Sequence, residues 1–437
     1  MLLVALFVIP LVFFLLFRRK RSPPVVPTDE RWTTTRSTLD DASIRPFTIS
    51  IKEDDLEDLR ARLRNARLPS RPFKEKNDAA WAYGADADFV KRLQTHWIEK
   101  FDWRQQEVTL NRYNHYLTNI EGIDVHFMRA RPEGEGAKPL LLLHGWPGSF
   151  YEFHKVVPKL IDSSCGGAVF DVVCPSMPGY GFSEAAEKPG MSIVVVARIF
   201  SKLMERLGFE SYVVQGGDWG SFVASALGYI DRKHCKGIHL NAFTPIPTLP
   251  NILRIVLYNV FPQLLSPHER RMLKSPIINL KGLAREGGYY LLQSSKPHSI
   301  GYALNDSPLG LACYIIEKFS AWSDGEGVEN QFTLDEMLTN VCIYWFTQTA
   351  TSSMRLYKES AKSKLDSKVL RCPIDVPVAL CDFPAEPLRV PKTLISNRYR
   401  NVVQCSKMSK GGHFAALEEP ELLVEDVRKF CTLIGYS

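Results

Sequence analysis

The stretch YVVQGGDWGSFVASAL, at residues 212–227, decides the fold of this 437-residue chain. A short β-branched run leads into the small residues of GGDWG, and an apolar helix-forming run follows. This order predicts a strand, a sharp turn and a helix, with the side chain of Asp218 presented at the tip of the turn. A carboxylate needs no base before it attacks, so Asp218 suits displacement at an electrophilic carbon. The product would be an ester that must then be hydrolysed.

Strand-like runs alternate with helical patterns along much of the chain. The runs lie at 123–130, 139–143, 169–174, 212–215, 237–241, 376–381 and 401–405. Helical patterns at 194–207 and 420–434 fall between or after them. The alternation predicts an α/β protein with a mostly parallel sheet. Residues 244–370 interrupt it with a longer, aromatic-rich stretch of helical pattern, so we expect a helical lid inserted after the sixth strand.

The N-terminal part has a different character. Residues 1–17 are uncharged and almost wholly apolar, and the basic tetrad RRKR follows at 18–21. Because the charge follows the run and no cleavage site appears, this segment predicts an uncleaved membrane anchor rather than a signal peptide. The positive-inside rule then places the catalytic body in the cytosol. Apolar positions at helical spacing within 51–68 and 89–101 predict amphipathic helices beyond a Pro- and Ser-rich linker.

These patterns predict six parts. They are an anchor with a basic flank at 1–21, a linker at 22–45, an N-terminal helical lobe at 46–135, the first part of the core at 136–243, a lid at 244–370 and the second part of the core at 371–437. The net charge is +6, of which residues 18–21 carry four charges, so nucleic-acid binding is not expected. The nine cysteines show no zinc-type spacing and fit a reducing compartment.

Other candidate residues follow from the chain order nucleophile, acid, histidine that is typical of α/β-hydrolases. The GGHF segment after the last strand supplies His413. The acid that would orient its imidazole is either Asp382 or Glu386, since both follow the 376–381 strand. The backbone N–H groups of Trp146, in the HGWP loop, and of Trp219 are the candidate oxyanion hole.

Six motifs together carry a family resemblance. They are HGWPGSFYEF at 144–153, PSMPGYGFSEA at 175–185, QGGDWGS at 215–221, ALNDSPLGL at 303–311, LTNVCIYW at 338–345 and GGHFAALEEPELL at 411–423. As a set they resemble the microsomal, membrane-bound epoxide hydrolases of the α/β-hydrolase superfamily. The likeness covers nearly the whole chain, including the N-terminal anchor and the helical lobe.

The resemblance implies roles for further residues. The acid of this family lies in an F-P-x-E segment, which matches residues 383–386 and favours Glu386 over Asp382. Two lid tyrosines hold and protonate the epoxide oxygen. The segments GYYLLQ and RLYKE indicate Tyr289 and Tyr357, with Tyr290 as a rival to Tyr289.

The expected function is hydrolysis of lipophilic epoxides to trans-diols through an ester on Asp218, with water activated by His413 and Glu386. No cofactor or metal is expected, and the partners are substrate, water and membrane lipid at residues 1–21. The resemblance implies the endoplasmic reticulum membrane. The alternatives are a haloalkane dehalogenase, a serine esterase and a catalytically silent, membrane-anchored lipophile-binding protein. The choice between xenobiotic and endogenous epoxides, the stereochemistry and the oligomeric state stay open.

Overall fold

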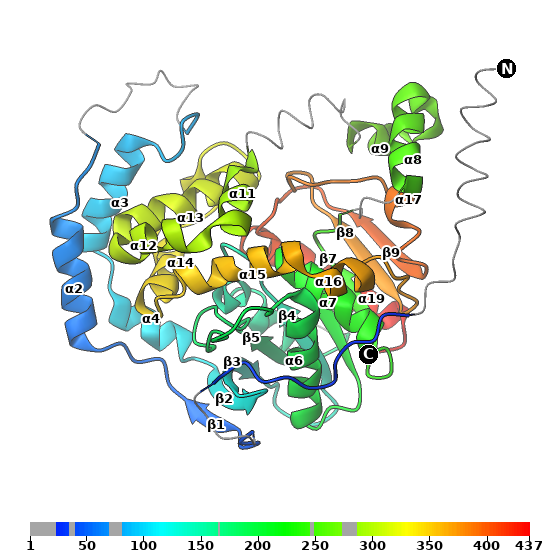
Figure 1. The fold of residues 1–437 in the computed structure, drawn as a ribbon, viewed down its shortest axis with the longest axis horizontal. Helices are drawn as coiled ribbons and strands as arrows, with labels where there is room; N and C mark the ends of the chain where they lie inside the picture. The colour runs from blue at the N-terminus through cyan, green and yellow to red at the C-terminus, as the bar shows by residue number, and fades with distance from the viewer. Residues whose placement is uncertain (1–22, 35–39, 70–80, 165–166, 245–248, 273–285) are drawn as a thin grey trace.

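The computed structural model describes residues 23–34, 40–69, 81–164, 167–244, 249–272 and 286–437. Within them lies a nine-stranded sheet with the strand order β1-β2-β3-β5-β4-β6-β7-β8-β9 (Figure 1). The strands are β1 (Arg45–Phe47), β2 (Asn114–Ile120), β3 (Ile123–Ala130), β4 (Lys138–Leu143), β5 (Phe170–Pro175), β6 (Tyr212–Gly216), β7 (Cys235–Leu240), β8 (Val378–Asp382) and β9 (Val402–Lys407). The pairings β1–β2, β2–β3 and β3–β5 are antiparallel, and all others are parallel. The predicted α/β fold with a mostly parallel sheet is confirmed.

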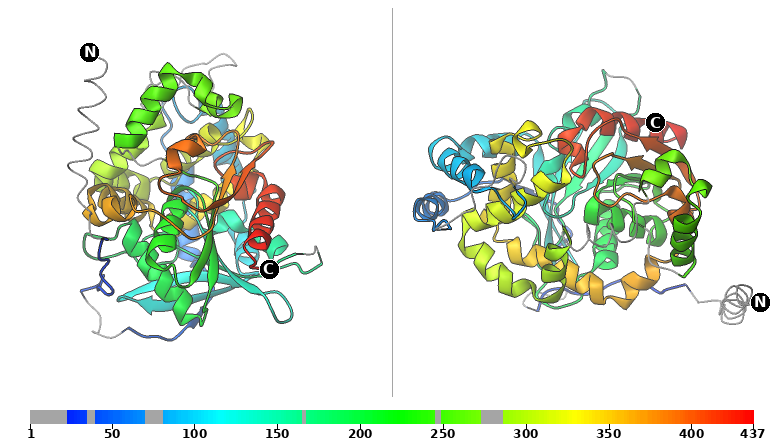
Figure 2. Two further views of the ribbon diagram at one scale, coloured as in Figure 1. Left: turned by 90° about the vertical axis from the view of Figure 1, so that its right-hand side faces the viewer. Right: turned by 90° about the horizontal axis from the view of Figure 1, so that it is seen from above.

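Helices cover both faces of this sheet (Figure 2). The helices next to it are α5 (Val157–Leu160), α6 (Ile193–Arg206), α7 (Asp218–Ile230), α17 (Lys392–Ile395), α18 (Ala415–Glu418) and α19 (Pro420–Leu433). Two neighbouring residues of β7 face opposite sides of the sheet and contact different helices. A Cβ atom at Gly237 would lie 2.7 Å from the Phe430 ring of α19, whereas Ile238 lies against Gly228 of α7. Burial on both faces explains why the central strands are apolar runs without alternation.

A long series of helices lies between β7 and β8, where the sequence predicts the lid. Its members are α8 (Leu249–Val260), η2 (Pro262–Leu264), α9 (Pro267–Met272), α11 (Gly288–Ser295), α12 (Pro297–Asp306), α13 (Pro308–Trp322), η3 (Val328–Asn330), α14 (Leu334–Phe346), α15 (Ala350–Lys362) and α16 (Lys364–Val369). In Figure 1, α11 to α15 form a layer above the sheet. Its inner side chains are buried, including Ile316, Val341 and Tyr357. This layer therefore packs onto the carboxyl ends of the parallel strands.

Two of the predicted N-terminal helices, α2 (Glu53–Arg64) and α3 (Ala87–Glu99), pack against that layer. Their apolar stripes are buried, and ion pairs surround the contact. Arg62 lies 2.8 Å from Asp306 of α12, and Arg92 lies 2.6 Å from Glu329. Helices α2 and α3 thus pack on the outer side of the lid.

The sheet extends further toward the N-terminus than the sequence indicated. Strand β2, helix α4 (Trp103–Leu110) and the short β1 were not predicted, and β2 and β3 fall within the range expected to be a helical lobe. Residues 23–34, in the predicted linker, pack on this part of the protein. Trp32 is 1% exposed, and its indole N–H donates to the Glu121 carboxylate at 2.8 Å. The domain boundaries themselves stay a prediction.

Within the described ranges, no helix is long and apolar enough to cross a bilayer. The predicted anchor at 1–21 lies outside the described residues.

Candidate active site

Asp218 stands at the bend between β6 and α7, as the sequence predicts. Its φ angle is +42°, in the left-handed region, where backbone strain is characteristic of functional sites. The turn fits only because its neighbours lack side chains. A Cβ atom at Gly220 would lie 2.0 Å from the Leu143 carbonyl oxygen, and one at Gly216 would lie 2.5 Å from the Gly220 carbonyl oxygen. The glycines of GGDWG therefore allow the strained turn that carries the carboxylate.

The HGWP loop follows β4 and faces this carboxylate. The backbone N–H of Trp146 donates to Asp218 Oδ1 at 2.8 Å. A Cβ atom at Gly145 would lie 2.2 Å from the same oxygen, so only glycine admits the close approach. Among the hydrogen bonds of the described residues, none joins the Trp219 N–H to this carboxylate. Trp146 is thus placed as predicted for an oxyanion donor, and the role of Trp219 stays a prediction.

Two residues of α14 form hydrogen bonds to the HGWP loop and to Ser149 just after it. The sequence analysis assigned no function to them. The Asn340 amide donates to the Pro147 carbonyl at 2.8 Å and accepts from the Ser149 hydroxyl at 2.9 Å. The Tyr344 hydroxyl donates to the Gly148 carbonyl at 2.6 Å. Both side chains belong to the quoted motif LTNVCIYW, which was the available signal. They fix the loop that positions the Trp146 N–H.

His413 lies between two carboxylates. Its Nε2 is 3.5 Å from Asp218 Oδ2, and its Nδ1 is 2.8 Å from Glu386 Oε2. Asp382, the other candidate acid, instead forms a bidentate pair with Arg389 at 2.7 Å and contacts His268 at 3.0 Å. The geometry therefore agrees with Glu386 as the partner of the imidazole.

Aromatic side chains form the wall above Asp218. The Tyr357 ring, from α15, meets the Trp219 ring edge-on with centroids 4.7 Å apart. The Tyr289 ring, from α11, stacks on Trp146 at 5.1 Å. Tyr357 Oη and Trp219 Nε1 are both buried and have no hydrogen-bond partner in the described part of the chain. Because buried polar groups are normally satisfied, these two are suited to receive a ligand atom.

Tyr289 and Tyr290 both contact the Tyr357 ring, with centroids 5.9 and 5.6 Å away. Tyr290 is 40% exposed, whereas burial and the charge of Asp218 raise the pKa of Tyr289. The stacking of Tyr289 on Trp146, whose N–H donates to Asp218, favours Tyr289 over Tyr290. Burial likewise raises the pKa of Tyr357 well above its usual range. Both phenols are therefore protonated at neutral pH.

The charge state of His413 follows from its two neighbours. Burial lowers the pKa of His413, but the carboxylates of Glu386 and Asp218 outweigh burial and raise it well above 6.5. At neutral pH the imidazole is therefore protonated. Conversion of Asp218 to a neutral ester would remove one of these charges, lower the histidine pKa and release a base.

A pH dependence follows for the two chemical steps. The rate constant of ester formation should be flat from about pH 6 to about pH 9, because burial raises the pKa of both phenols and keeps them protonated throughout. The rate constant of ester hydrolysis should rise with pH as His413 in the ester loses its proton. Rapid-quench kinetics with a styrene-type epoxide would separate the two. A hydrolysis rate that fell with rising pH would contradict this assignment.

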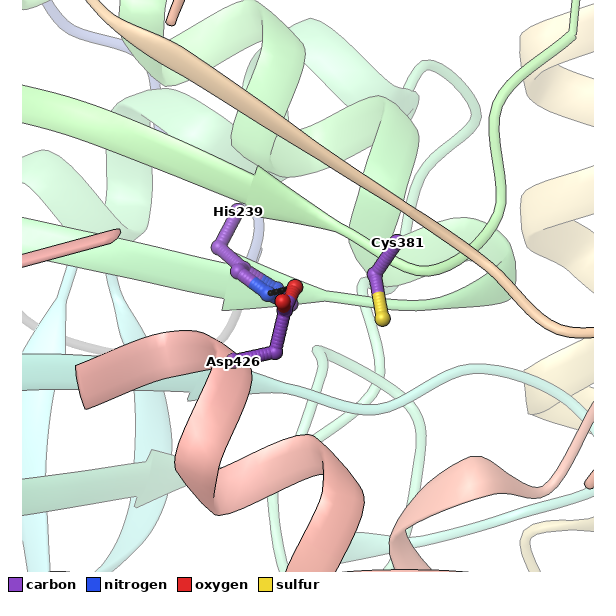
Figure 3. Close-up of side chains that lie close together, drawn as sticks. All are labelled: His239, Cys381 and Asp426. Carbon is purple, nitrogen blue, oxygen red and sulfur yellow. Dashed lines mark hydrogen bonds and ion pairs between the residues drawn. The ribbon is translucent and has the colours of Figure 1, made fainter. Parts of the chain in front are cut away.

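Figure 3 shows His239, Cys381 and Asp426, the side chains among the described residues whose ligand atoms lie close enough to hold a metal ion. His239 Nε2 and Asp426 Oδ2 are hydrogen-bonded at 2.9 Å, and Asp426 Oδ1 accepts from Ser406. Burial raises the pKa of the Cys381 thiol well above its usual range. Structural zinc sites have four ligands with deprotonated thiolates. His239, Cys381 and Asp426 offer three ligands with a protonated thiol. They therefore fit a buried polar contact between β7 and α19.

The sheet order, the bend at Asp218 and the imidazole between two carboxylates define the protein as an α/β-hydrolase. Residues 44–153 match the family model for the epoxide hydrolase N terminus, and residues 138–268 match that for the alpha/beta hydrolase fold.

Similar proteins narrow this class. Epoxide hydrolase 1 from Sus scrofa is 42% identical, covering 90% of each chain. Juvenile hormone epoxide hydrolase 1 from Ctenocephalides felis is 38% identical, over 92% of this chain and 89% of that one. The crystal structure of juvenile hormone epoxide hydrolase from Bombyx mori has a TM-score of 0.88 at 34% identity, covering 94% of this chain and 99% of that one. The chain therefore belongs to the epoxide hydrolase family and is an enzyme that hydrolyses epoxides. This decides against a haloalkane dehalogenase, a serine esterase and a catalytically silent binding protein.

Proposed function

We propose that the chain opens lipophilic epoxides through a covalent ester on Asp218 and then hydrolyses that ester. One observation supports the proposal: His413 Nε2 lies 3.5 Å from Asp218 Oδ2, and His413 Nδ1 is hydrogen-bonded to Glu386. The buried Tyr357 phenol, whose oxygen has no hydrogen-bond partner in the described residues, packs against Trp219, the neighbour of Asp218. A nucleophile next to a base that a third group orients is the arrangement that covalent catalysis requires.

In the first step, Asp218 Oδ2 attacks one epoxide carbon and the ring carbon–oxygen bond breaks. Oδ1 accepts a hydrogen bond from the Trp146 N–H at 2.8 Å, whereas Oδ2 has the longer contact, 3.5 Å to His413 Nε2, so we assign the attack to Oδ2. Tyr357 and Tyr289 donate hydrogen bonds to the ring oxygen, and one of them supplies its proton. Attack opposite the breaking bond gives a trans relationship between the two oxygens.

In the second step, His413 removes a proton from water, and the water oxygen attacks the ester carbonyl carbon. The developing oxyanion is Oδ1, which the Trp146 N–H stabilises, with Trp219 N–H as the proposed second donor. The tetrahedral intermediate collapses, and the departing alkoxide takes a proton from His413. The resulting Asp218 carboxylic acid then gives its proton to His413. The tyrosinate left by the first step regains the proton that His413 releases when the ester forms, so all three groups return to their starting forms. Glu386 orients the imidazole and stabilises its charged form.

Isotope labelling tests this route. A single turnover in ¹⁸O-labelled water should place the label in the Asp218 carboxyl group and leave the first-formed diol unlabelled, because the diol oxygen comes from the aspartate. Mass spectrometry of the diol and of the Asp218 peptide reads both outcomes. Labelled diol in the first turnover would show direct attack by water on the epoxide.

Replacing Tyr357 with phenylalanine should lower the rate of ester formation by about 10²-fold, the typical effect of losing one donor to a developing oxyanion. The ring packing against Trp219 is retained, so the melting temperature should hardly change. Tyr290→Phe is the matched control, since that residue is next to Tyr289 in the chain and 40% exposed. Rapid-quench measurement of epoxide loss checks both. Equal effects of the two substitutions would contradict the role of Tyr357.

The aromatic wall formed by Trp146, Tyr289 and Tyr357 supports lipophilic substrates. Relatives named for juvenile hormone epoxides and for general epoxide hydrolysis are similarly distant, so both classes stay candidates. Steady-state kcat/KM values for styrene oxide, a terpenoid epoxide and an epoxy fatty acid would choose between them. A preference of less than about tenfold would favour a broad detoxifying role.

We also propose that residues 1–21 anchor the enzyme in the endoplasmic reticulum membrane with the catalytic body in the cytosol. The apolar run followed by RRKR supports this orientation. Membrane fractionation of cells expressing the chain with and without these residues tests the anchor. Equal recovery of both forms in the soluble fraction would rule it out.

A further inference from the structure

A small polar cavity lies beside the reacting groups. Its volume is about 20 Å³, enough for one water molecule. His413 and Asp218 line it, together with three further polar side chains, those of Glu152, Gln215 and Asn241. The mechanism described above assigns no role to these last three side chains.

The Glu152 side chain is unusual because it has no hydrogen-bond or ion-pair partner among the described residues. It lies in the 3-10 helix η1 (Phe150–Phe153), just after the HGWP loop. A Cβ atom at position 148 would lie 2.1 Å from Glu152 Oε2, so Gly148 leaves the space that the carboxyl group occupies. Glu152 is partly buried and lines the cavity, so a water in that cavity is the partner that its carboxyl group can take.

A second polar atom at this cavity also lacks a partner. Gln215 donates through Nε2 to Asn241 at 2.8 Å, but its Oε1 is buried and unpaired in the part of the chain that the structure describes. Buried waters usually make two to four hydrogen bonds. The Glu152 carboxyl, Gln215 Oε1 and the His413 imidazole all line this cavity, and a water there has two hydrogens to donate to two of these three groups.

We propose that Glu152 binds the hydrolytic water and aims it at the ester carbonyl carbon of Asp218. This proposal rests on the covalent route above and assigns the group that holds its second reactant. The water donates one hydrogen to His413 Nε2 and the other to a Glu152 oxygen, which directs an oxygen lone pair at the carbonyl carbon. As the new carbon–oxygen bond forms, His413 takes the first proton and later returns it to the departing diol alkoxide. Glu152 neither gains nor loses a proton.

The charge balance of the site suits a neutral acid at this position. Burial raises the pKa of Glu152 well above its usual range; the charge of His413 opposes the shift and that of Asp218 adds to it. A neutral carboxyl group still offers a carbonyl oxygen to the water. It also avoids placing another negative charge beside the nucleophile.

Three substitutions test the role, each measured by rapid-quench kinetics that follow epoxide loss and diol appearance separately. Glu152→Met removes the acceptor and should slow ester hydrolysis by up to about 100-fold, the typical cost of misplacing a reacting group, with little change in ester formation. Glu152→Asp withdraws the carboxyl group, keeps its chemistry and should show the same selective defect. Glu152→Gln keeps an uncharged acceptor and should retain both rates. The aspartate variant secures the test if the methionine variant does not fold.

The outcomes separate this proposal from the covalent route itself. Unchanged hydrolysis in the methionine and aspartate variants, or equal loss of both steps, would overturn the role of Glu152 while leaving the route intact. A glutamine variant as slow in hydrolysis as the methionine variant would overturn the neutral-acceptor argument. Failure of the unaltered enzyme to form any ester would instead refute the mechanism on which the proposal depends.

Discussion

Asp218→Ala is expected to abolish diol formation, with kcat falling by roughly 10⁴- to 10⁶-fold, as for other catalytic nucleophiles. Its carboxylate is the group that we propose attacks the epoxide, and alanine offers no replacement. Asp218 itself already adopts the left-handed φ angle of +42°, and the cost of that region is only slightly greater for alanine, so the melting temperature should change little.

Initial rates of diol formation, with thermal unfolding measured in parallel, check this expectation. Asp88→Ala is a matched control, because Asp88 lies exposed on α3, away from the site. That variant should keep the parental rate. If Asp218→Ala also made diol at the parental rate, attack by this carboxylate could not be part of the reaction.

His413→Gln is expected to separate the two halves of the reaction. Asp218 and the phenols remain, so epoxide should be consumed in an amount equal to the enzyme. Diol release should then fall by about 10⁴-fold or more, because no base activates the water. The result would be a burst of epoxide loss without turnover.

A burst experiment with excess epoxide measures both phases. His96→Gln is a suitable control, since that histidine lies on α3 and pairs with Asp335. It should show normal turnover. Loss of the burst together with turnover in His413→Gln would mean that the imidazole is needed before the ester forms.

Much of this site could be predicted from the sequence, because parallel strands buried on both faces are recognisable as apolar runs. The residues that follow them share one edge of the sheet, so Asp218, His413 and the HGWP loop could be brought together from chain order alone. The glycines of GGDWG also carried information, since their lack of side chains is what the turn requires.

Other features depended on contacts that spacing does not specify. Asp382 and Glu386 were equivalent by position. In the structure Glu386 contacts His413 at 2.8 Å, whereas Asp382 pairs with Arg389. Strand β2 was not predicted because its polar residues mask the alternation in NHYLTNI. The roles of Asn340 and Glu152 follow from the HGWP loop and the cavity that these residues contact, and spacing in the sequence does not reveal those contacts.

The covalent ester on Asp218 can be located by mass spectrometry. The enzyme is mixed with epoxide, quenched in acid within milliseconds and digested, and the peptides are then examined by mass spectrometry. If Asp218 is the nucleophile, one peptide gains the full mass of the epoxide, and fragmentation places that mass on Asp218. An adduct on another side chain, or diol formation with no adduct at any quench time, would contradict it.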